Sequence, residues 1–355
     1  MKPILTCNDL HLGVSRIAGT TPASAEALKS YLLNSFSTLL HQHKDKDLLI
    51  AGDLFDNFEV DSKTLLDTYY VLADWLNDTG NALHLMGGNH DFSPRGDKVS
   101  SFHLLANFLQ SRFGDKVQVL DQGLSKVVDG VWAISHVANQ DVFELELAKA
   151  LELGSGLLIL HCNVMPPACH GQRDHSLALN EAQCRTLTEK FTILGAHEHQ
   201  HLTHTFDRPI IMMGNNFPSS VSDCMVKGAA QKDGKKYAHV ISEAGIDRVV
   251  TCDMLGEFAV VDWRDLDAVC GYSFIRVGGT AKAEEAALVM SAIAKFRAAS
   301  SAFVVSNAVV IEGVVGAEEA AEAIYSNVKA FNVMEALLEH LTDKQQIVVR
   351  EVLSA

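Results

Sequence analysis

Residues 88–91, Gly-Asn-His-Asp, combine an amide, an imidazole and a carboxylate within one short segment. The segment follows an apolar run, residues 82–86, that is typical of a buried strand, and the glycines at 87 and 88 predict a tight turn after it. Open α/β sheets place their chemistry at the carboxyl ends of such strands. The oxygen of Asn89 can bind a metal, and His90 can act as an acid or a base. Taken alone, the four residues fit the tip of a polar hairpin equally well.

Four further groups of polar side chains follow other apolar runs of strand length. Together the five groups contain these candidate metal ligands: Asp9, His11, Asp53, Asn89, His161, His197 and His199. In an extended segment residues i and i+2 point the same way, so we expect the Asp-x-His and His-x-His pairs each to aim two donors at one point. A single group of this kind is usually a loop or a turn. Five in chain order, each after a predicted strand, indicate one shared site.

The types of these donors point to divalent ions. Oxygen and imidazole ligands without thiolates suit manganese, iron, zinc or nickel. Seven donors exceed what one ion needs, whereas two ions that share a bridging carboxylate use all of them. Two ions about 3.5–4 Å apart form the clamp used for phosphoryl transfer to water, in which a metal-activated water attacks the phosphate. The leaving group then needs a proton, and His90 is placed to deliver it.

The elements that must position these residues alternate between strands and helices. Predicted strands at residues 3–7, 47–51, 82–86, 157–160 and 192–194 are interleaved with predicted helices at 24–43, 62–77, 99–113, 142–153 and 180–190. This alternation predicts a layered α/β domain over residues 1–254. Near Gly256 the pattern changes. Strand-like runs at 273–277 and 302–311 bracket an amphipathic helix that contains Leu288, Met290, Ile293 and Phe296, which predicts a smaller α/β domain over residues 255–331. A helical segment, 332–355, follows.

Composition places the chain among ordinary globular proteins, with 48% hydrophobic and 21% charged residues. No apolar stretch is long enough to span a bilayer, and the first residues lead directly into a strand, so we expect neither a membrane segment nor a signal peptide. The seven cysteines are scattered and lack CxxC spacing. This favours reduced thiols and a cytoplasmic location, and it argues against a zinc finger.

The formal net charge of −15 bears on the substrate. Proteins that bind nucleic acid unaided usually carry a basic face, and the sequence contains no cluster of lysine and arginine. Either the substrate is not a polymer, or bound cations and a partner supply the positive charge.

The motifs D-x-H, G-D-x-x-D, G-N-H-D, a lone H and H-x-H resemble those of the calcineurin-like metallophosphoesterase superfamily. Residues 8–13, 52–56, 88–91 and 213–219 more closely resemble the SbcD-type subunits of DNA double-strand-break repair exonucleases. The resemblance implies a four-layer α/β/β/α metallophosphoesterase sandwich with a smaller C-terminal α/β cap domain. The sequence departs from the family pattern at Asn8, where serine is common, and at Ala196, where glycine is common.

The resemblance also implies roles for the candidate residues. Asp9, His11 and His199 would hold the first ion, Asn89, His161 and His197 the second, with Asp53 bridging and His90 as the general acid. The ions would be Mn²⁺, with Mg²⁺, Fe²⁺ or Zn²⁺ as alternatives. Asp56 would either support the catalytic site or face the substrate, and a helix N-cap is an equal alternative. His136 and Arg173 are candidates for substrate contact.

The expected function is therefore that of a DNA exo- or endonuclease subunit in repair, recombination or DNA degradation. The partners implied by the resemblance are DNA, an SbcC-like SMC/ABC ATPase and a second copy of the chain. Residues 332–355 would either dock this ATPase or close the core of the cap domain itself. Two alternatives stay open. A nucleotide phosphodiesterase or phosphatase of the same superfamily fits the acidic surface better, and a catalytically silent scaffold would not require a complete set of ligands.

Overall fold

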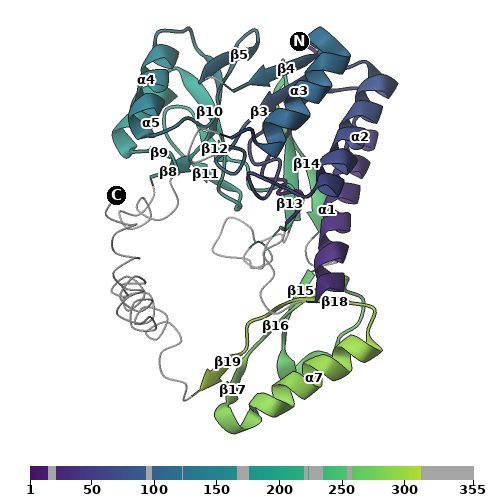
Figure 1. Cartoon of the computed structure of the whole chain (residues 1–355). Coiled ribbons are helices and arrows are strands. Elements are labelled where there is room, and N and C mark those ends of the chain that lie inside the picture. The colour runs from purple at the N-terminus through teal and green to yellow at the C-terminus, as the bar shows by residue number, and fades with distance from the viewer. Residues whose placement is uncertain are drawn as a thin grey trace, which may run out of the picture.

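The computed structural model describes residues 1–14, 21–92, 98–121, 123–165, 176–219, 223, 235–253 and 258–312. Two six-stranded sheets pack face to face, and helices cover the outer face of each (Figure 1). The α/β fold class and the four-layer sandwich predicted from the sequence are confirmed. Among the described residues, none of the helices is long and apolar enough to cross a membrane. The five described cysteines are not paired in disulfides.

The first sheet is built around four parallel strands that alternate with helices along the chain. Its order is β14 (Gly245–Asp253), β13 (Lys235–Ser242), β1 (Ile4–Cys7), β2 (Asp47–Ala51), β3 (Leu83–Met86) and β4 (Val117–Leu120). Strands β1 to β4 run parallel, whereas β13 pairs antiparallel with β1 and β14. The outer face is covered by α1 (Pro22–Gln42), α2 (Ser62–Thr79) and α3 (Ser101–Phe113).

The second sheet repeats the arrangement on the other side. Its order is β11 (Leu202–His204), β12 (Ile210–Met212), β10 (Phe191–Ala196), β7 (Gly156–His161), β6 (Val131–Ile134) and β5 (Leu124–Val128). Strands β12, β10, β7 and β6 are parallel, and the two edge strands are antiparallel to their neighbours. Helices α4 (Gln140–Leu151) and α5 (Glu181–Thr188) cover it, and a short pair, β8 (Asn163–Val164) and β9 (Ala178–Leu179), lies beside it.

Alternation along the buried strands creates the layers. In β2, Leu48 and Ile50 pack against the helices, whereas Leu49 and Ala51 face the other sheet. In β7 the same division separates Leu158 and Leu160, which pack in the cluster with α4 and α5, from residues 157 and 159, which join the layer between the sheets. Successive residues of a strand point to opposite faces, so strands buried on both faces read as continuous apolar runs.

Residues 258–312 form a smaller α/β unit with its own apolar cluster. Strands β15 (Phe258–Asp262), β16 (Phe274–Gly278) and β18 (Phe303–Asn307) are parallel, and β17 (Thr280–Lys282) pairs with β19 (Val310–Glu312). Helix α7 (Ala286–Ala299) packs on these strands, and the 3-10 turns η3 (Trp263–Ala268) and η4 (Ala283–Glu285) lie nearby. A further 3-10 turn, η1 (Gly114–Lys116), belongs to the sandwich and follows α3. The domain limits stay predictions, and residues 332–355 lie outside the described residues.

Two sequence expectations for this unit are wrong. The run 302–311 is not one strand but two, β18 and β19, which belong to different sheets, and the sequence reading missed β15. The predicted helix is present as α7, but only two of the four apolar residues named from the sequence face the core. Val289, Ile293 and Phe296 are buried at helical spacing, whereas Leu288 and Met290 are 60% and 59% exposed. The many alanines of the helix leave its apolar stripe broad, so composition alone did not fix its phase.

The smaller unit touches the sandwich through α1. The ring of Tyr31 packs edge-on against Phe258 and Phe274, with centroid distances of 5.5 and 5.1 Å.

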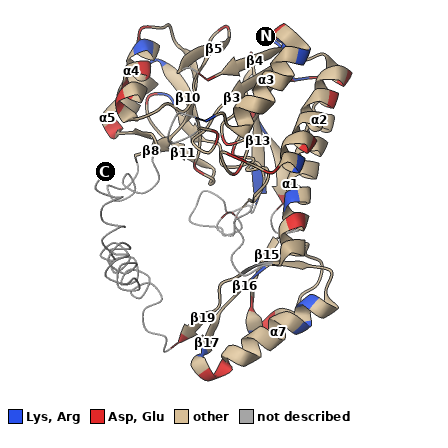
Figure 2. Ribbon diagram, in the orientation of Figure 1, with Lys and Arg blue, Asp and Glu red and all other residues tan. Residues whose placement is uncertain are grey.

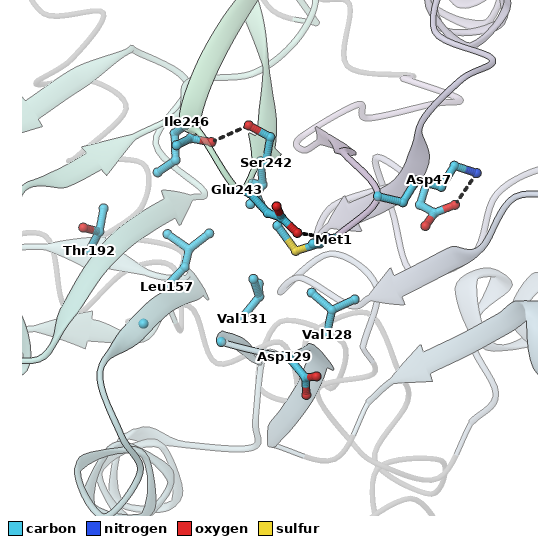
Figure 3. Close-up of a pocket in the computed structure, with 15 residues that line it drawn as sticks. Met1, Asp47, Val128, Asp129, Val131, Leu157, Thr192, Ser242, Glu243 and Ile246 are labelled. Atoms are coloured by element: carbon cyan, nitrogen blue, oxygen red, sulfur yellow. Dashed lines mark hydrogen bonds and ion pairs between the residues drawn. The ribbon is translucent and has the colours of Figure 1, made fainter.

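A cavity of about 650 Å³ lies in the sandwich, at the amino-terminal edges of β1, β2 and β7, where Lys2, Asp47 and Leu157 contribute to its lining (Figure 3). This cavity is at the opposite end of the strands from the polar groups described below.

The phase of α7 predicts unequal effects of two alanine substitutions. Ile293→Ala removes a fully packed side chain and should lower the free energy of unfolding by about 2–5 kcal/mol. Met290→Ala, one turn away on the exposed face, should change it by less than about 0.5 kcal/mol. Urea unfolding of both variants measures this. Equal losses would mean that the helix packs through the face with Leu288 and Met290.

Candidate metal centre

The predicted polar groups meet at one edge of the sandwich. They follow or end five parallel strands, β1, β2 and β3 of the first sheet and β7 and β10 of the second. Because the carboxyl ends of parallel strands lie at the same edge, residues separated by up to 190 positions in the chain become neighbours. Three overlapping groups of carboxylates and imidazoles have ligand atoms within 4.8 Å of one another, and all belong to this edge.

The local backbone is not extended at the ligands, contrary to the expectation from the sequence. Asp9, His11, Asp53 and His197 have φ angles of 48°, 45°, 49° and 85°, in the left-handed region. This conformation costs a residue with a side chain about 1–2 kcal/mol. It turns the chain sharply after each strand, where the ligand atoms of these side chains come close together. Strain of this kind persists where the surroundings fix it, typically at functional sites.

The first ligand group contains Asp9, His11 and His199. The Nε2 atoms of His11 and His199 are 3.0 Å apart. Asp9 is fully buried, and its carboxylate accepts hydrogen bonds from the side-chain amide of Asn8 at 2.6 Å and from the backbone N–H of His197 at 3.0 Å. Asn8 therefore does more than replace the usual serine, because it fixes the carboxylate beside it.

The second group contains Asn89, His161 and His197 around one point. The side-chain oxygen of Asn89 lies 3.0 Å from Nε2 of His161 and 3.0 Å from Nδ1 of His197. The expectation that the His-x-His pair aims at a single point is therefore wrong. The left-handed residue His197 separates the two imidazoles, and each joins a different group.

Asp53 lies between the two groups. Its Oδ2 atom is 3.4 Å from Nε2 of His161 and 3.9 Å from Nε2 of His11. The backbone N–H of His90 donates to the other oxygen at 2.9 Å. Burial by itself raises the pKa of Asp53, but the imidazoles of His161, His11 and His90 outweigh it and hold this pKa well below its usual range. Burial disfavours the charged form of His161, but the negative charge of Asp53 outweighs this and raises the pKa of His161 to about 9.

These residues fit two divalent ions. Ligands bonded at about 2.0–2.2 Å to one ion stand about 3–3.6 Å apart, which matches the 3.0–3.4 Å separations within each group. Asp9 and Asp53 are carboxylates with 0% and 1% exposure. Buried negative charge of this kind requires nearby positive charge. The mixture of carboxylate, amide and imidazole ligands suits borderline or hard divalent metals.

His90 lies on the open side of the two groups, with a quarter of its side chain exposed. Its Nδ1 donates to the backbone carbonyl of Asp56 at 2.6 Å, an interaction that leaves Nε2 as the atom able to exchange a proton. Nε2 lies 4.0 Å from the Asp53 carboxylate, and the ring packs edge-on against His11.

Asp56 is 2% exposed, and its carboxylate lies 3.3 Å from Nδ1 of His11. This burial places Asp56 behind the imidazoles and away from solvent. The N-cap alternative is wrong, because the cap of α2 is Asp61, which accepts from the N–H of Thr64 at 2.9 Å.

His136 lies beside the turn after β3, where its N–H donates to the carbonyl of Gly87 at 3.0 Å. Burial and the charge of His161 lower its pKa to about 4, so its imidazole is neutral near pH 7. Its ring lies against Phe92. Arg173, the other predicted substrate contact, lies outside the described residues.

Two carboxylates of the site received no role from the sequence. Asp91 is buried and accepts from the backbone N–H groups of Gly88 at 2.9 Å and Leu54 at 3.4 Å, which ties the turn after β3 to the loop after β2. Burial and the nearby Asp53 raise its pKa to about 7. Its place inside the Gly-Asn-His-Asp segment was a usable signal. Asp223, which lies 2.8 Å from Nδ1 of His199, is in a segment with no such signal.

The family to which the sequence matches agrees with this geometry. The family described as calcineurin-like phosphoesterase matches residues 2–201, more than half of the chain, and the protein belongs to this family. It is thus a member of a family of metal-dependent phosphoester hydrolases. No curated protein matches the chain.

Two solved structures are similar to it. Protein TT1561 of Thermus thermophilus has 10% sequence identity and a TM-score of 0.42, with 71% of this chain and 99% of that chain covered. A dimetal phosphatase from Danio rerio has 10% identity and a TM-score of 0.36 with the same coverage.

Close packing at the strand ends predicts a sensitive glycine. A Cβ on Gly52 would lie 2.1 Å from Nδ1 of His161, and its φ of 94° disfavours any side chain. Gly52→Ala should lower the free energy of unfolding by about 2–5 kcal/mol and weaken metal binding. Gly130 has a φ of 76° with open space around it, so Gly130→Ala isolates the backbone cost, about 1–2 kcal/mol. Urea unfolding and manganese titration compare the two. Similar behaviour of both variants would contradict the described position of His161.

Proposed function

We propose that the protein is a two-metal phosphodiesterase that acts on DNA, an SbcD-like nuclease subunit. The observation that carries the proposal is the convergence of two complete ligand groups on one carboxylate oxygen of Asp53. The choice of DNA as substrate is supported by the resemblance of residues 8–13, 52–56, 88–91 and 213–219 to that branch of the family.

In this proposal Asp9, His11 and His199 hold one ion, Asn89, His161 and His197 hold the other, and Asp53 binds both. Divalent ions bound there, with Mn²⁺ as the proposed metal and Mg²⁺, Fe²⁺ or Zn²⁺ as alternatives, would supply positive charge to the phosphate and acidify the attacking water. The chain itself orients the ligands through the strained turns and keeps their carboxylates out of solvent.

His90 is the proposed general acid. Because the carbonyl of Asp56 accepts from Nδ1, a proton gained by the imidazole resides on Nε2, on the open side of the site. From there it can pass to the leaving oxygen of the cleaved phosphodiester. His136, neutral and close to the same turn, is proposed to contact the substrate.

The net charge of −15 is the main feature in favour of the alternative, a phosphodiesterase for nucleotides. Figure 2 shows lysine and arginine interspersed with acidic residues on the described helices. Bound ions and a basic partner would supply the charge that a DNA complex needs. The proposed partner is an SbcC-like SMC/ABC ATPase, and its expected docking segment, residues 332–355, lies outside the described residues.

His90→Ala tests both the substrate and the acid. With Mn²⁺, the wild-type protein should degrade linear double-stranded DNA and also cleave bis(4-nitrophenyl) phosphate. The substitution should slow DNA cleavage about 10²–10⁴-fold. It should slow cleavage of the nitrophenyl ester much less, because nitrophenolate leaves without a proton.

Asp53→Asn serves as the control and should abolish both activities. Ester cleavage without DNA cleavage by the wild-type protein, alone and with its ATPase, would favour the nucleotide alternative. Equal loss on both substrates in His90→Ala would contradict the acid role.

We also propose that the protein forms a homodimer through the exposed apolar face of α2 and α3, here called the α2–α3 patch. It consists of Leu66, Tyr70, Leu104 and Phe108, which are 49%, 57%, 38% and 51% exposed. Leu66 with Tyr70 and Leu104 with Phe108 stand four residues apart, so each pair shares one helix face. The ring of Tyr69 lies 6.4 Å from Phe108 and joins the two helices. A twofold pairing of two copies would bury both patches at once.

Tyr70→Glu tests the dimer. Light scattering coupled to gel filtration should give twice the chain mass of 38.6 kDa for the wild type and the monomer mass for the variant. Leu145→Glu is the control, because Leu145 is 63% exposed on α4, away from the patch. A wild-type monomer at micromolar concentration, or dissociation by the control alone, would contradict this interface.

A further inference from the structure

Asp223 holds the imidazole of His199 in place, and the consequence of this contact for metal binding depends on the proposed two-metal function. Asp223 is 2% exposed, and its Oδ1 atom lies 2.8 Å from Nδ1 of His199. A carboxylate can only accept, so Nδ1 carries the hydrogen, and the lone pair of the neutral ring is on Nε2. Nε2 is the atom that faces His11 across 3.0 Å, so Asp223 selects the tautomer in which His199 can act as a ligand.

The other oxygen of Asp223 is held just as firmly. Its Oδ2 accepts from the backbone N–H of Ser219 at 2.9 Å, from the Ser219 hydroxyl at 3.1 Å and from the side-chain amide of Asn215 at 3.1 Å. All of these groups donate toward Asp223. Residue 223 must therefore present acceptors on both sides, a requirement that a carboxylate meets and an amide does not.

Asn215 and Lys236 also fix the backbone of His199. The carbonyl of His199 accepts from the N–H of Asn215 at 3.3 Å and from the ammonium group of Lys236 at 2.8 Å. Lys236 is 1% exposed. Both the main chain and the imidazole of His199 are thus held by residues that are not members of either ligand group.

His199 and His11 of the first group differ from His161 of the second in the group that faces Nδ1. In the first group Asp223 accepts a hydrogen bond from Nδ1 of His199, and the Asp56 carboxylate lies 3.3 Å from Nδ1 of His11 without the geometry of a hydrogen bond. In the second, Nδ1 of His161 lies 3.2 Å from the neutral carbonyl of Ala51, and Asn89 is itself a neutral ligand. A carboxylate behind an imidazole makes it a stronger donor, and the loss of such a partner typically costs 10–100-fold in metal affinity.

We propose that Asp223 is a positioning residue for His199 and that, together with Asp56, it makes the site of Asp9, His11 and His199 the tighter of the two ion sites. This site fills first. The site of Asn89, His161 and His197 fills second and exchanges its ion more readily.

Manganese titration of the metal-free protein, with free Mn²⁺ followed by electron paramagnetic resonance, tests the proposal without any substrate. The wild type should bind two ions in two resolved steps. Asp223→Asn keeps the size of the side chain, but if its oxygen accepts from Ser219 and Asn215, its NH₂ group faces Nδ1 and favours the wrong tautomer. The tight step should weaken about 10–100-fold while the weak step is unchanged. Asn89→Ala should remove the weak step and keep the tight one.

Glu146→Gln is the matched control. Glu146, on α4 and away from the ligands, is a carboxylate with 8% exposure that accepts from the backbone N–H of Leu124. The substitution should leave both steps unchanged. If urea unfolding shows that Asp223→Asn is not folded, Asp56→Asn tests the same binding step through His11. If Asp223→Asn, or Asp56→Asn in its place, weakens both steps equally or weakens neither, the proposal is overturned. Two-step binding without DNA cleavage would instead overturn only the nuclease function.

Discussion

The structure depends on one carboxylate oxygen, Oδ2 of Asp53, which is buried between imidazoles contributed by both sheets. A buried carboxylate costs several kcal/mol unless charges and hydrogen bonds compensate it. Here a backbone N–H occupies one oxygen and imidazoles surround the other. Because the compensating groups come from different sheets, the two halves of the sandwich must meet at a fixed separation. This constraint explains why Gly88, whose Cβ would lie 2.2 Å from Asp53, has no side chain.

The same burial couples folding to metal binding. Asp9, Asp53, Asp56 and Asp91 are each 2% exposed or less and belong to one site. Like charges placed so close disfavour the ionised state, and the raised pKa of Asp91, about 7, reflects burial and the charge of Asp53. Divalent ions that bind only the folded chain would relieve this repulsion and stabilise the fold in proportion to their binding free energy. The left-handed turns at the strand ends are therefore held by the packed sheets and by the charge that the site is built to receive.

The sequence was sufficient for features that depend on local pattern. Apolar runs located the main strands, and the polar residues after them located the carboxylates and imidazoles that cluster in the structure, because a strand end is a local property. The spacing of residues in the sequence does not show which side chains join which of the two groups. His197 and His199 separate into different groups because His197 adopts a φ of 85°, which no spacing rule indicates. Asp223 contacts a histidine 24 positions away, and the sequence around Asp223 has no periodic pattern that indicates this contact. In α7 the abundance of alanine hid the phase of the helix.

The depth at which each ligand lies bears on the acidity of the chain. The carboxylates of the site are buried, whereas Asn89, His90, His197 and His199 are partly exposed. A phosphate that approaches the open side therefore meets an amide and imidazoles before it meets any carboxylate. The carboxylates act from below, where they hold the ligands and balance the charge of bound ions. The net charge of −15 is a sum over the whole chain and does not describe the charge at the open side of the site. Total charge is therefore a weak argument against a polyanionic substrate, because the local order of ligands determines what the scissile phosphate encounters.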